Sequence, residues 1–196
     1  GATAADQCGG SLTWTNDYSG LTSACGGTGS ATVTFTVADA AGNTSTTTAT
    51  FTIEDNTDPV MVTAASNLTV ECDGEGNLAD LQGWLDSSGG AFAEDACSAI
   101  TWTNNFTALS DECGGEGTAT VLFTATDACG NEKSTIATFH IEDSTAPSIE
   151  APEDYTVTCA DNIVYEDAVA SDACGGVTIS VTADTTSVSE AGIDYP

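Results

Sequence analysis

Acidic side chains gather in three short stretches of this sequence, and oxygen ligands at that density suit a calcium ion. The stretches are 53–59 (IEDNTDP), 73–77 (DGEGN) and 127–131 (DACGN). Calcium takes about six to eight oxygen ligands, mostly from carboxylates and carbonyls. We expect the three stretches to meet where one domain joins the next. The predicted ligands are Glu54, Asp55, Asp58, Asp73 and Asp127, with Glu142 and Asp143 at the following junction. The alternative is a solvated acidic surface whose Asp side chains cap turns.

Domain junctions are expected because the chain repeats itself. Residues 25–43 recur as 113–131, and residues 45–59 recur as 133–147, both at a shift of 88 residues. A period of this length predicts tandem small domains, since most solenoid units are shorter. We expect the C-terminal part of a first repeat at 1–58, a complete repeat at 59–146 and the N-terminal part of a third repeat at 147–196. The chain is therefore expected to be a fragment of a longer protein.

Eight cysteines in so acidic a chain predict an oxidising compartment and disulfide bonds. The first repeat has Ala41 where the complete repeat has Cys129. The cysteines that remain in the first repeat, Cys8 and Cys25, are therefore favoured to pair with each other, as are their counterparts Cys97 and Cys113. The predicted bonds all lie within repeats: Cys8–Cys25, Cys97–Cys113 and Cys72–Cys129. Cys159 and Cys174 are expected to find partners beyond Pro196 or to bond to each other. Zinc binding is the rival interpretation, but no CxxC pair is present and the spacing is wide.

The repeated segments alternate apolar residues with threonine, as in Ala119, Val121 and Phe123. A period of two with β-branched residues on the other face predicts strands that are buried on one side, at 31–37, 49–53, 119–125 and 137–141. Gly-Asn at 42–43 and 130–131 predicts the hairpin turns between them. Several short strands in each repeat favour an all-β fold of tandem immunoglobulin-like β-sandwiches. Leu78, Leu81, Trp84 and Leu85 predict one short helix within the complete repeat.

The aromatic residues and the single histidine are expected to have structural roles and not to take part in catalysis. Trp14 and Trp102 occupy the same place in two copies, and the third copy has Ile179 there, which favours a core position. Trp84 is the better candidate for an exposed contact, although its neighbours Leu81 and Leu85 favour packing. His140 replaces Thr52 of the first copy and is expected on the outward face of a strand. One Lys, one His and no Arg leave almost no material for a nucleophile–base triad, so we predict no enzyme activity.

Composition limits the partners. Thirty acidic residues against a single Lys give a net charge of −29, and phosphate recognition needs clustered cations. Nucleic acid is therefore excluded, and binding to anionic lipid head groups is disfavoured. No stretch is long and apolar enough to span a membrane, and no secretion signal is visible at Gly1. We expect contacts with neighbouring repeats of the same chain, with other copies laterally, or with surface polysaccharide.

The combination TDACGN at 126–131 and ATFHIEDSTAP at 137–147, with ITWTNN at 100–105, resembles the HYR-like, immunoglobulin-like repeats of giant secreted surface adhesins of Bacteroidota. That group includes gliding-motility adhesins exported by the type IX secretion system. The resemblance implies an extracellular cell-surface location, long linear arrays and adhesion. It also implies O-glycosylation at Ser144 and Thr185, and N-linked sequons stand at Asn43, Asn67 and Asn105.

Three functional hypotheses follow from the sequence. The first is a structural segment of a long extracellular adhesin, in which the repeats supply reach and mechanical stability. The second is a recognition module in which loops or the Trp84 segment bind sugar or protein. The third is a subunit of a self-assembling extracellular filament, with the Thr-rich strand faces as lateral contacts.

Overall fold

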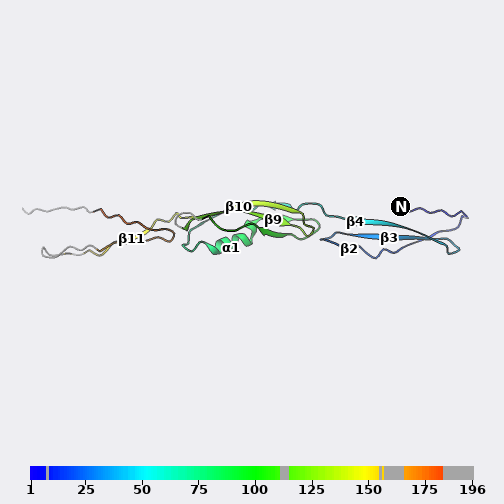
Figure 1. Ribbon diagram of the computed structural model, residues 1–196, viewed down its shortest axis with the longest axis horizontal. Coiled ribbons are helices and arrows are strands. Elements are labelled where there is room, and N and C mark those ends of the chain that lie inside the picture. The colour runs from blue at the N-terminus through cyan, green and yellow to red at the C-terminus, as the bar shows by residue number, and fades with distance from the viewer. Residues whose placement is uncertain (8, 111–114, 155, 157–165, 183–196) are drawn as a thin grey trace, which may run out of the picture.

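The computed structural model describes residues 1–7, 9–110, 115–154, 156 and 166–182, and Figure 1 shows three groups of strands that follow one another along an elongated molecule. The first sheet holds β1 (Thr13–Asn16), β2 (Thr22–Ser23), β3 (Gly29–Ala38) and β4 (Thr44–Ile53). The central unit holds β5 (Val60–Thr63), β6 (Leu68–Glu71), α1 (Leu78–Asp86), η1 (Ser88–Gly90), β7 (Phe92–Glu94), β8 (Thr101–Asn104), β9 (Gly117–Thr126) and β10 (Glu132–Glu142). The third sheet pairs β11 (Ser148–Glu150) with β12 (Val169–Ser171). Within the described residues, no helix is long and apolar enough to cross a membrane. The predicted repeat boundaries at 58/59 and 146/147 stay predictions.

The central unit is built from two sheets that share one segment of chain. β6, β10, β9 and β8 form the larger sheet in that order, and β5 pairs with β7 in a separate two-stranded sheet. β6 runs parallel to β10, with Leu68 opposite Phe139 and Glu71 opposite Glu142. The segment 60–71 therefore contributes a strand to each sheet. This arrangement confirms the predicted all-β, immunoglobulin-like fold.

The hairpins form where the alternation and the turn residues predict them. Along β9, every second residue from Gly117 to Ala125 is buried, while the residues between are partly or fully exposed. The turn that follows ends in Gly130, whose φ of 90° a residue with a Cβ rarely adopts. β10 then pairs antiparallel with the whole of β9. The predicted strands and the Gly-Asn turn are confirmed for this hairpin, and β3 and β4 repeat it.

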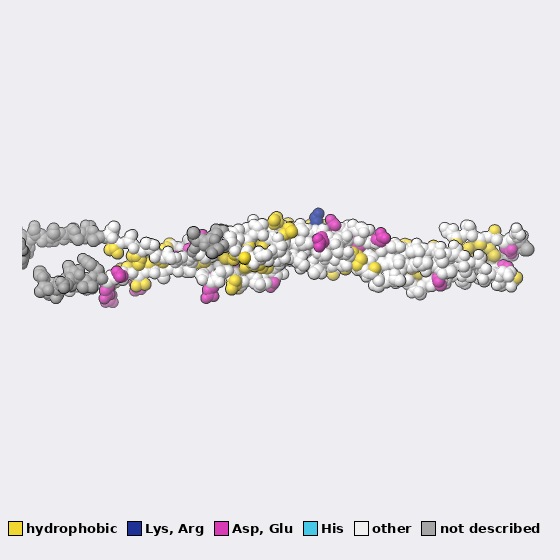
Figure 2. Space-filling view, viewed as in Figure 1, with side chains coloured by type: hydrophobic (Ala, Val, Ile, Leu, Met, Phe, Trp, Pro, Cys, Tyr) yellow, Lys and Arg dark blue, Asp and Glu magenta, His cyan; other side chains and the backbone are white. Residues whose placement is uncertain are grey.

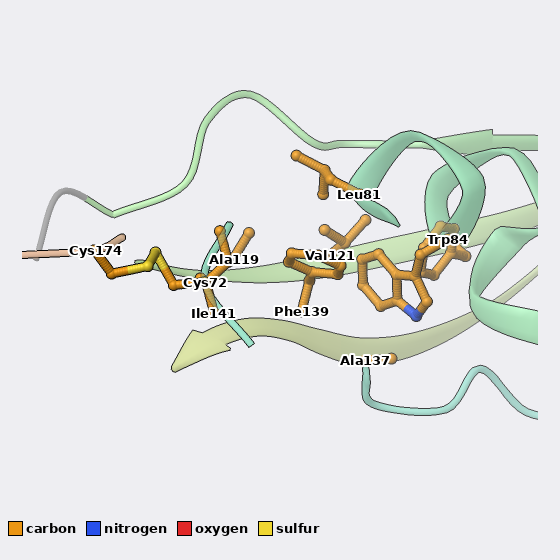
Figure 3. Packing of buried hydrophobic residues seen from close by; sticks show 10 residues of the cluster. Cys72, Leu81, Trp84, Ala119, Val121, Ala137, Phe139, Ile141 and Cys174 are labelled. Carbon is orange, nitrogen blue, oxygen red and sulfur yellow. A yellow bond between two sulfur atoms is a disulfide. The ribbon is translucent and has the colours of Figure 1, made fainter. Parts of the chain in front are cut away.

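The core of the central unit lies between the larger sheet and the predicted helix, which is confirmed as α1. Val121, Phe123, Phe139 and Ile141 are at most 1% exposed, and α1 covers them with Leu81 and Trp84 (Figure 3). The Trp84 ring meets Phe123 edge to face, with the ring centroids 5.1 Å apart. Its indole N–H donates a hydrogen bond to the carbonyl of Ser66 at 3.0 Å. Trp84 is therefore a core residue, and the hypothesis of an exposed contact at this position is wrong.

The same positions are not equally buried in the first sheet. Phe51, the counterpart of Phe139, is 60% exposed, and Trp14, the counterpart of Trp102, is 43% exposed. Nearly all of β4 is exposed to solvent. Among the described residues no helix of the α1 kind covers this sheet, so the predicted core position of Trp14 is wrong here. Trp102 is partly buried and packs against the central core, as predicted.

This difference gives the first prediction. We expect Phe139→Ala to lower the free energy of unfolding by about 3–5 kcal/mol, because it leaves a cavity in a closed core. The matched change Phe51→Ala removes the same side chain from an exposed face and should cost less than about 1 kcal/mol. Urea denaturation followed by tryptophan fluorescence measures both. Equal losses at the two positions would contradict the burial described above.

Candidate functional site

Two disulfide bonds join neighbouring units, one at each end of the central unit. At the first junction Cys25, in the turn between β2 and β3, bonds to Cys129 in the β9–β10 turn, with the Cα atoms 5.0 Å apart. At the second junction Cys72, just after β6, bonds to Cys174, just after β12, with a Cα separation of 5.9 Å. Figure 3 shows this second bond at the end of the central core, and both of its cysteines are 6% exposed. Each bond crosses from one group of strands to the next.

These pairings correct the bonds predicted from the sequence. The prediction of Cys72–Cys129 assumed that both residues lie at the same end of the sandwich. Because β6 is parallel to β10, Cys72 lies where β10 ends and Cys129 lies where β10 begins. Eleven residues of strand separate those ends, or about 35 Å. The predicted Cys72–Cys129 bond is therefore wrong. The predicted Cys8–Cys25 bond is also wrong, because Cys25 is bonded to Cys129.

Other cysteine predictions have mixed outcomes. Cys174 finds its partner within the chain, not beyond Pro196 and not in Cys159. Cys97 is a free and exposed thiol, so its predicted bond to Cys113 is not formed. Cys8, Cys113 and Cys159 lie outside the described residues. The prediction assumed that the cysteines of each repeat pair among themselves. In the structure the two bonded pairs join cysteines of different units.

The two junctions are built in the same way around a turn with the sequence Asp-Ala-Cys. At the first junction the backbone N–H of Cys97 donates to Asp95 at 2.8 Å. At the second junction the N–H of Cys174 donates to Asp172, also at 2.8 Å. Position 27 in the first sheet and position 115 in the central unit are both glycine. A Cβ at either would lie 3.6 Å from the carbonyl oxygen of the Cys in that turn. Cys97 and Cys174 thus occupy equivalent places.

Glycine allows the close approach of one unit to the next. A Cβ at Gly26 would lie 2.9 Å from the Cβ of Ser98, and one at Gly74 would lie 2.4 Å from the carbonyl oxygen of Ala173. Both glycines also have positive φ. Any side chain at these positions would push the neighbouring turn away. The contact between the units therefore requires glycine at both positions.

The predicted calcium ligands do not all meet. Asp55 and Asp127 lie at the first junction, where the Asn131 side-chain amide donates both to Asp127 at 2.7 Å and to the backbone carbonyl of Asp55 at 3.3 Å. Asp73 lies at the opposite end of the central unit with Glu142 and Asp143, since β6 ends there. The predicted convergence of all three stretches at one junction is wrong for the same reason as the Cys72–Cys129 bond.

Several of these carboxylates accept hydrogen bonds from backbone N–H groups of the turns in which they lie. Asp127 is 6% exposed, and one of its oxygens accepts the N–H groups of Cys129 and Asn131 at 2.7 and 2.9 Å. Asp73 accepts from the N–H groups of Glu75 and Asn77 in the same way, and these bonds lower its pKa. This is the turn-capping alternative. Glu54 and Asp58 are exposed on the linker.

One cluster of side chains at the first junction has the donor atoms to hold a cation. Carboxylate oxygens of Asp55 and Asp95 and the Sγ atom of Cys97 lie within 4.8 Å of one another. Oδ2 of Asp55 is buried without a hydrogen-bond partner, and in the described part of the chain it alone has that property among side-chain oxygens and nitrogens. Sequence reasoning missed Asp95, although its signal is present in the repeated DAC at 95–97 and 172–174. β7 ends beside Val60, so the residues after it reach the linker.

Glu71 fastens the linker at the second junction. Its carboxylate accepts from the hydroxyls of Ser144 and Thr145, both at 2.7 Å, and from the Ser144 N–H at 3.0 Å. The hydroxyl of Thr145 and then that of Ser144 hold the pKa of Glu71 below its ordinary value. Ser144 is one of the residues proposed for O-glycosylation, so a glycan on its oxygen would remove one of these bonds.

The remaining candidate residues lie on the surface of the described chain or outside it. Asn43, Asn67 and Asn105 are exposed. The side-chain oxygens of Asn67 and Asn105 accept backbone N–H groups of Thr138 and Leu122. Glycosylation at these sites stays a prediction, and Thr185 is not among the described residues. His140 is half-buried on the predicted face of β10, and its Nδ1 lies 3.0 Å from the hydroxyl of Thr118.

Comparison with known proteins finds only distant similarity. No family model matches the chain, and no curated protein matches it. Among solved structures, the EC1-4 fragment of PcdhgB3 is 13% identical over 65% of this chain and 35% of that one, with a TM-score of 0.29. The EC3-6 cis-dimer structure of protocadherin gammaB7 is 13% identical over 84% of this chain and 52% of that one, with a TM-score of 0.30. The chain thus spans from about a third to about half of these structures, and similarity at this level supports no functional argument.

The contacts of Glu71 give the second prediction. We expect Thr145→Ala and Ser144→Ala each to raise the pKa of Glu71 towards its ordinary value, because each removes a hydrogen bond to the charged form. A lowered folded-state pKa stabilises the fold above the unfolded pKa, and this stabilisation is lost as the pH falls through the folded value. Carboxyl NMR titration measures the shift. Ser148→Ala is the control, because that hydroxyl contacts Ser171 instead, and a shift there would contradict the assignment.

Proposed function

We propose that this chain is a structural, tension-bearing segment of a long extracellular adhesin, whose repeats give reach and mechanical stability for surface adhesion or gliding. The observation that carries the proposal is the connectivity of the two disulfides. Each joins different units, and their loops overlap, because the chain meets the cysteines in the order 25, 72, 129, 174. Disulfides persist in oxidising, extracellular surroundings. Export by type IX secretion and attachment to polysaccharide remain parts of this proposal that rest on the resemblance.

Overlapping loops give the chain three covalent paths that run in parallel between the two bonded pairs of cysteines. One path crosses the Cys25–Cys129 bond and then follows the chain from 129 to 174. A second follows the chain from 25 to 72 and then crosses the Cys72–Cys174 bond. Residues 72–129, which include α1 and β9, form the third and longest path between the same two bonded pairs. When the chain is fully stretched, the two shorter outer segments and the sulfur atoms become taut first, so the core strand β9 bears less of the end-to-end tension.

This topology makes the two bonds redundant. The Cys25–Cys129 bond removes 104 residues from the extensible length, and the Cys72–Cys174 bond removes 102. Bonds in separate loops would add their effects, whereas overlapping bonds do not. Either bond alone holds nearly the same length.

Single-molecule force spectroscopy on the full chain, pulled from its two ends, tests this proposal. Reduction should lengthen the fully stretched chain by about 340–370 Å, which is the extended length of the residues that the bonds hide. Removing one bond, with Cys25→Ser and Cys129→Ser together, should change the stretched length by only about 10 Å. The matched pair Cys72→Ser and Cys174→Ser should behave alike, and all four changes together should release the full length.

Peptide mapping after cleavage at acidic residues serves as the control, since Lys133 is the single site for a trypsin-like protease. It should find the 25–129 and 72–174 linkages in the unmodified chain. If each single-bond variant instead released its own length additively, the overlapping topology and the proposed function would both fail.

We also propose that calcium binds at the first junction through Asp55 and Asp95, with backbone carbonyls and water completing the oxygen ligands. The buried oxygen of Asp55 has no hydrogen-bond partner, and two carboxylates this close repel each other in a chain of net charge −29. A divalent ion would relieve both costs. Glu54 and Asp58 are exposed on the linker and do not belong to this cluster.

Thermal unfolding with and without calcium tests this site. At a calcium concentration of about one hundred times Kd, binding adds about 2.7 kcal/mol of stability and raises Tm by several degrees. Asp55→Asn should abolish this response and, without calcium, should leave stability unchanged or raised, because the repulsion is gone. The control Asp58→Asn should keep the response. A Tm that calcium does not move would refute the site and leave the disulfide argument untouched.

A further inference from the structure

The outer edge of β4 and the face that it shares with β3 are open in the described structure. β4 pairs with β3 along one edge, and no described strand pairs with its other edge. The face carries Phe51, which is 60% exposed, and Trp14, which is 43% exposed. A hollow of about 420 Å³ is lined there by Trp14, Phe35 and Val37. An open edge beside an open apolar face is a ready position for another strand.

The central unit shows what occupies the same place. β10 is the counterpart of β4, and its outer edge pairs in parallel with β6. α1 follows β6 and lays Trp84 over Phe123, the counterpart of Phe35. Phe139, the counterpart of Phe51, is then fully buried. One continuous segment, from β6 through α1, therefore closes both the edge and the face.

The register of β6 fixes where its last residue lies. Glu71 pairs with Glu142 at the end of β10, and the N–H of the next residue, Cys72, donates to the carbonyl of Glu142 at 2.9 Å. On β4 the counterpart of Glu142 is Glu54, the neighbour of Asp55. A strand of the β6 type on β4 would therefore place its terminal cysteine at the first junction, beside the cluster that contains the Cys97 thiol.

Cys97 has the same setting as a cysteine that is already bonded. Cys174, its equivalent at the second junction, is bonded to Cys72. The two share the Asp-Ala-Cys turn, the hydrogen bond from the Cys N–H to the Asp side chain and the facing glycine. The first junction is already crossed by the Cys25–Cys129 bond. It also contains Cys97, one of the two cysteines that a bond of the Cys72–Cys174 type needs.

The surroundings of Cys97 argue against a reactive or redox-sensing thiol. Partial desolvation, and then the negative charges of Asp55, Asp95 and Asp127, raise its pKa. Reactive cysteines have electropositive surroundings that favour the thiolate. A structural bond needs no such activation once the partner is held in place.

We propose that the open edge of β4 and the thiol of Cys97 form a docking site for a β6-type strand of the same, first repeat, whose terminal cysteine bonds to Cys97. The occupant is a segment like 59–89 in the same polypeptide, because the chain's own copy is already used in the central core. The proposal rests on the proposed function and adds that two disulfides cross the first junction, one of the type Cys25–Cys129 and one of the type Cys72–Cys174. Forming the bond removes two protons and two electrons from the two thiols, and an oxidised small-molecule disulfide such as oxidised glutathione accepts them.

The test adds a second copy of residues 59–89 directly before Gly1 of the full chain, which keeps the register because Gly1 aligns with Gly90. In the unmodified chain Cys97 should react fully with a maleimide. In the fusion, in a glutathione redox buffer, this labelling should be lost. Mass spectrometry should then find the added copy's cysteine linked to Cys97, and hydrogen exchange of the β4 amides should be slowed.

Two variants of the fusion separate docking from bonding. With Cys72→Ser in the added copy alone, β4 should stay protected while Cys97 reacts again. With Cys97→Ser, the added cysteine should become the reactive one. A fusion in which Cys97 stays reactive, in which β4 is not protected, or in which the added cysteine bonds elsewhere would overturn the proposal. Loss of labelling without a linked peptide, reversed by a chelator, would indicate a metal ligand and overturn it too. The force measurement uses other cysteines, so its result stands apart from this one.

Discussion

The close contact between each unit and the next, held by a disulfide at each junction, is the constraint on which this structure depends. A small β-sandwich has little core, and disulfides commonly supply what such a core lacks. Here the bonds do not tie one sheet of a sandwich to the other. They tie the end of one unit to the turn of its neighbour, so that covalent strength lies where a string of domains is otherwise weakest. This close contact requires Gly26 and Gly74, because a side chain at either position would separate the units.

The high negative charge has to be managed at the same places. A net charge of −29 destabilises compact states through repulsion, and the junctions bring several carboxylates together. Most of them are stabilised by backbone N–H groups of their own turns, as Asp127 and Asp73 show, or by hydroxyls of the next linker, as Glu71 shows. On the face seen in Figure 2, the acidic side chains are spread along the molecule among neutral ones, with the one Lys near its middle. Asp55 is the exception, since one of its oxygens is buried without a partner.

Equivalent residues in the two copies behave differently because burial is a property of the assembled unit. Phe51 and Phe139 both follow an Ala-Thr pair and have the same cross-strand partner, alanine. Only Phe139 has a helix and a parallel strand against it. The comparison between copies therefore served well for strands and turns, which depend on local sequence. It served poorly for exposure, as at Trp14, and for cysteine pairing.

The sequence by itself determined the repeat, the long hairpins, the Gly-Asn turns, the α1 helix and the all-β fold, because alternation and turn chemistry act over a few residues. Only the tertiary structure decided which ends of the strands meet. The parallel pairing of β6 with β10 sends Cys72 and Asp73 to the opposite end from Cys129 and Asp127. That one choice of direction separates the predicted calcium ligands and joins Cys72 and Cys129 each to a cysteine of a neighbouring unit. No local pattern encodes it, since a strand of alternating residues reads the same whether its partner runs parallel or antiparallel.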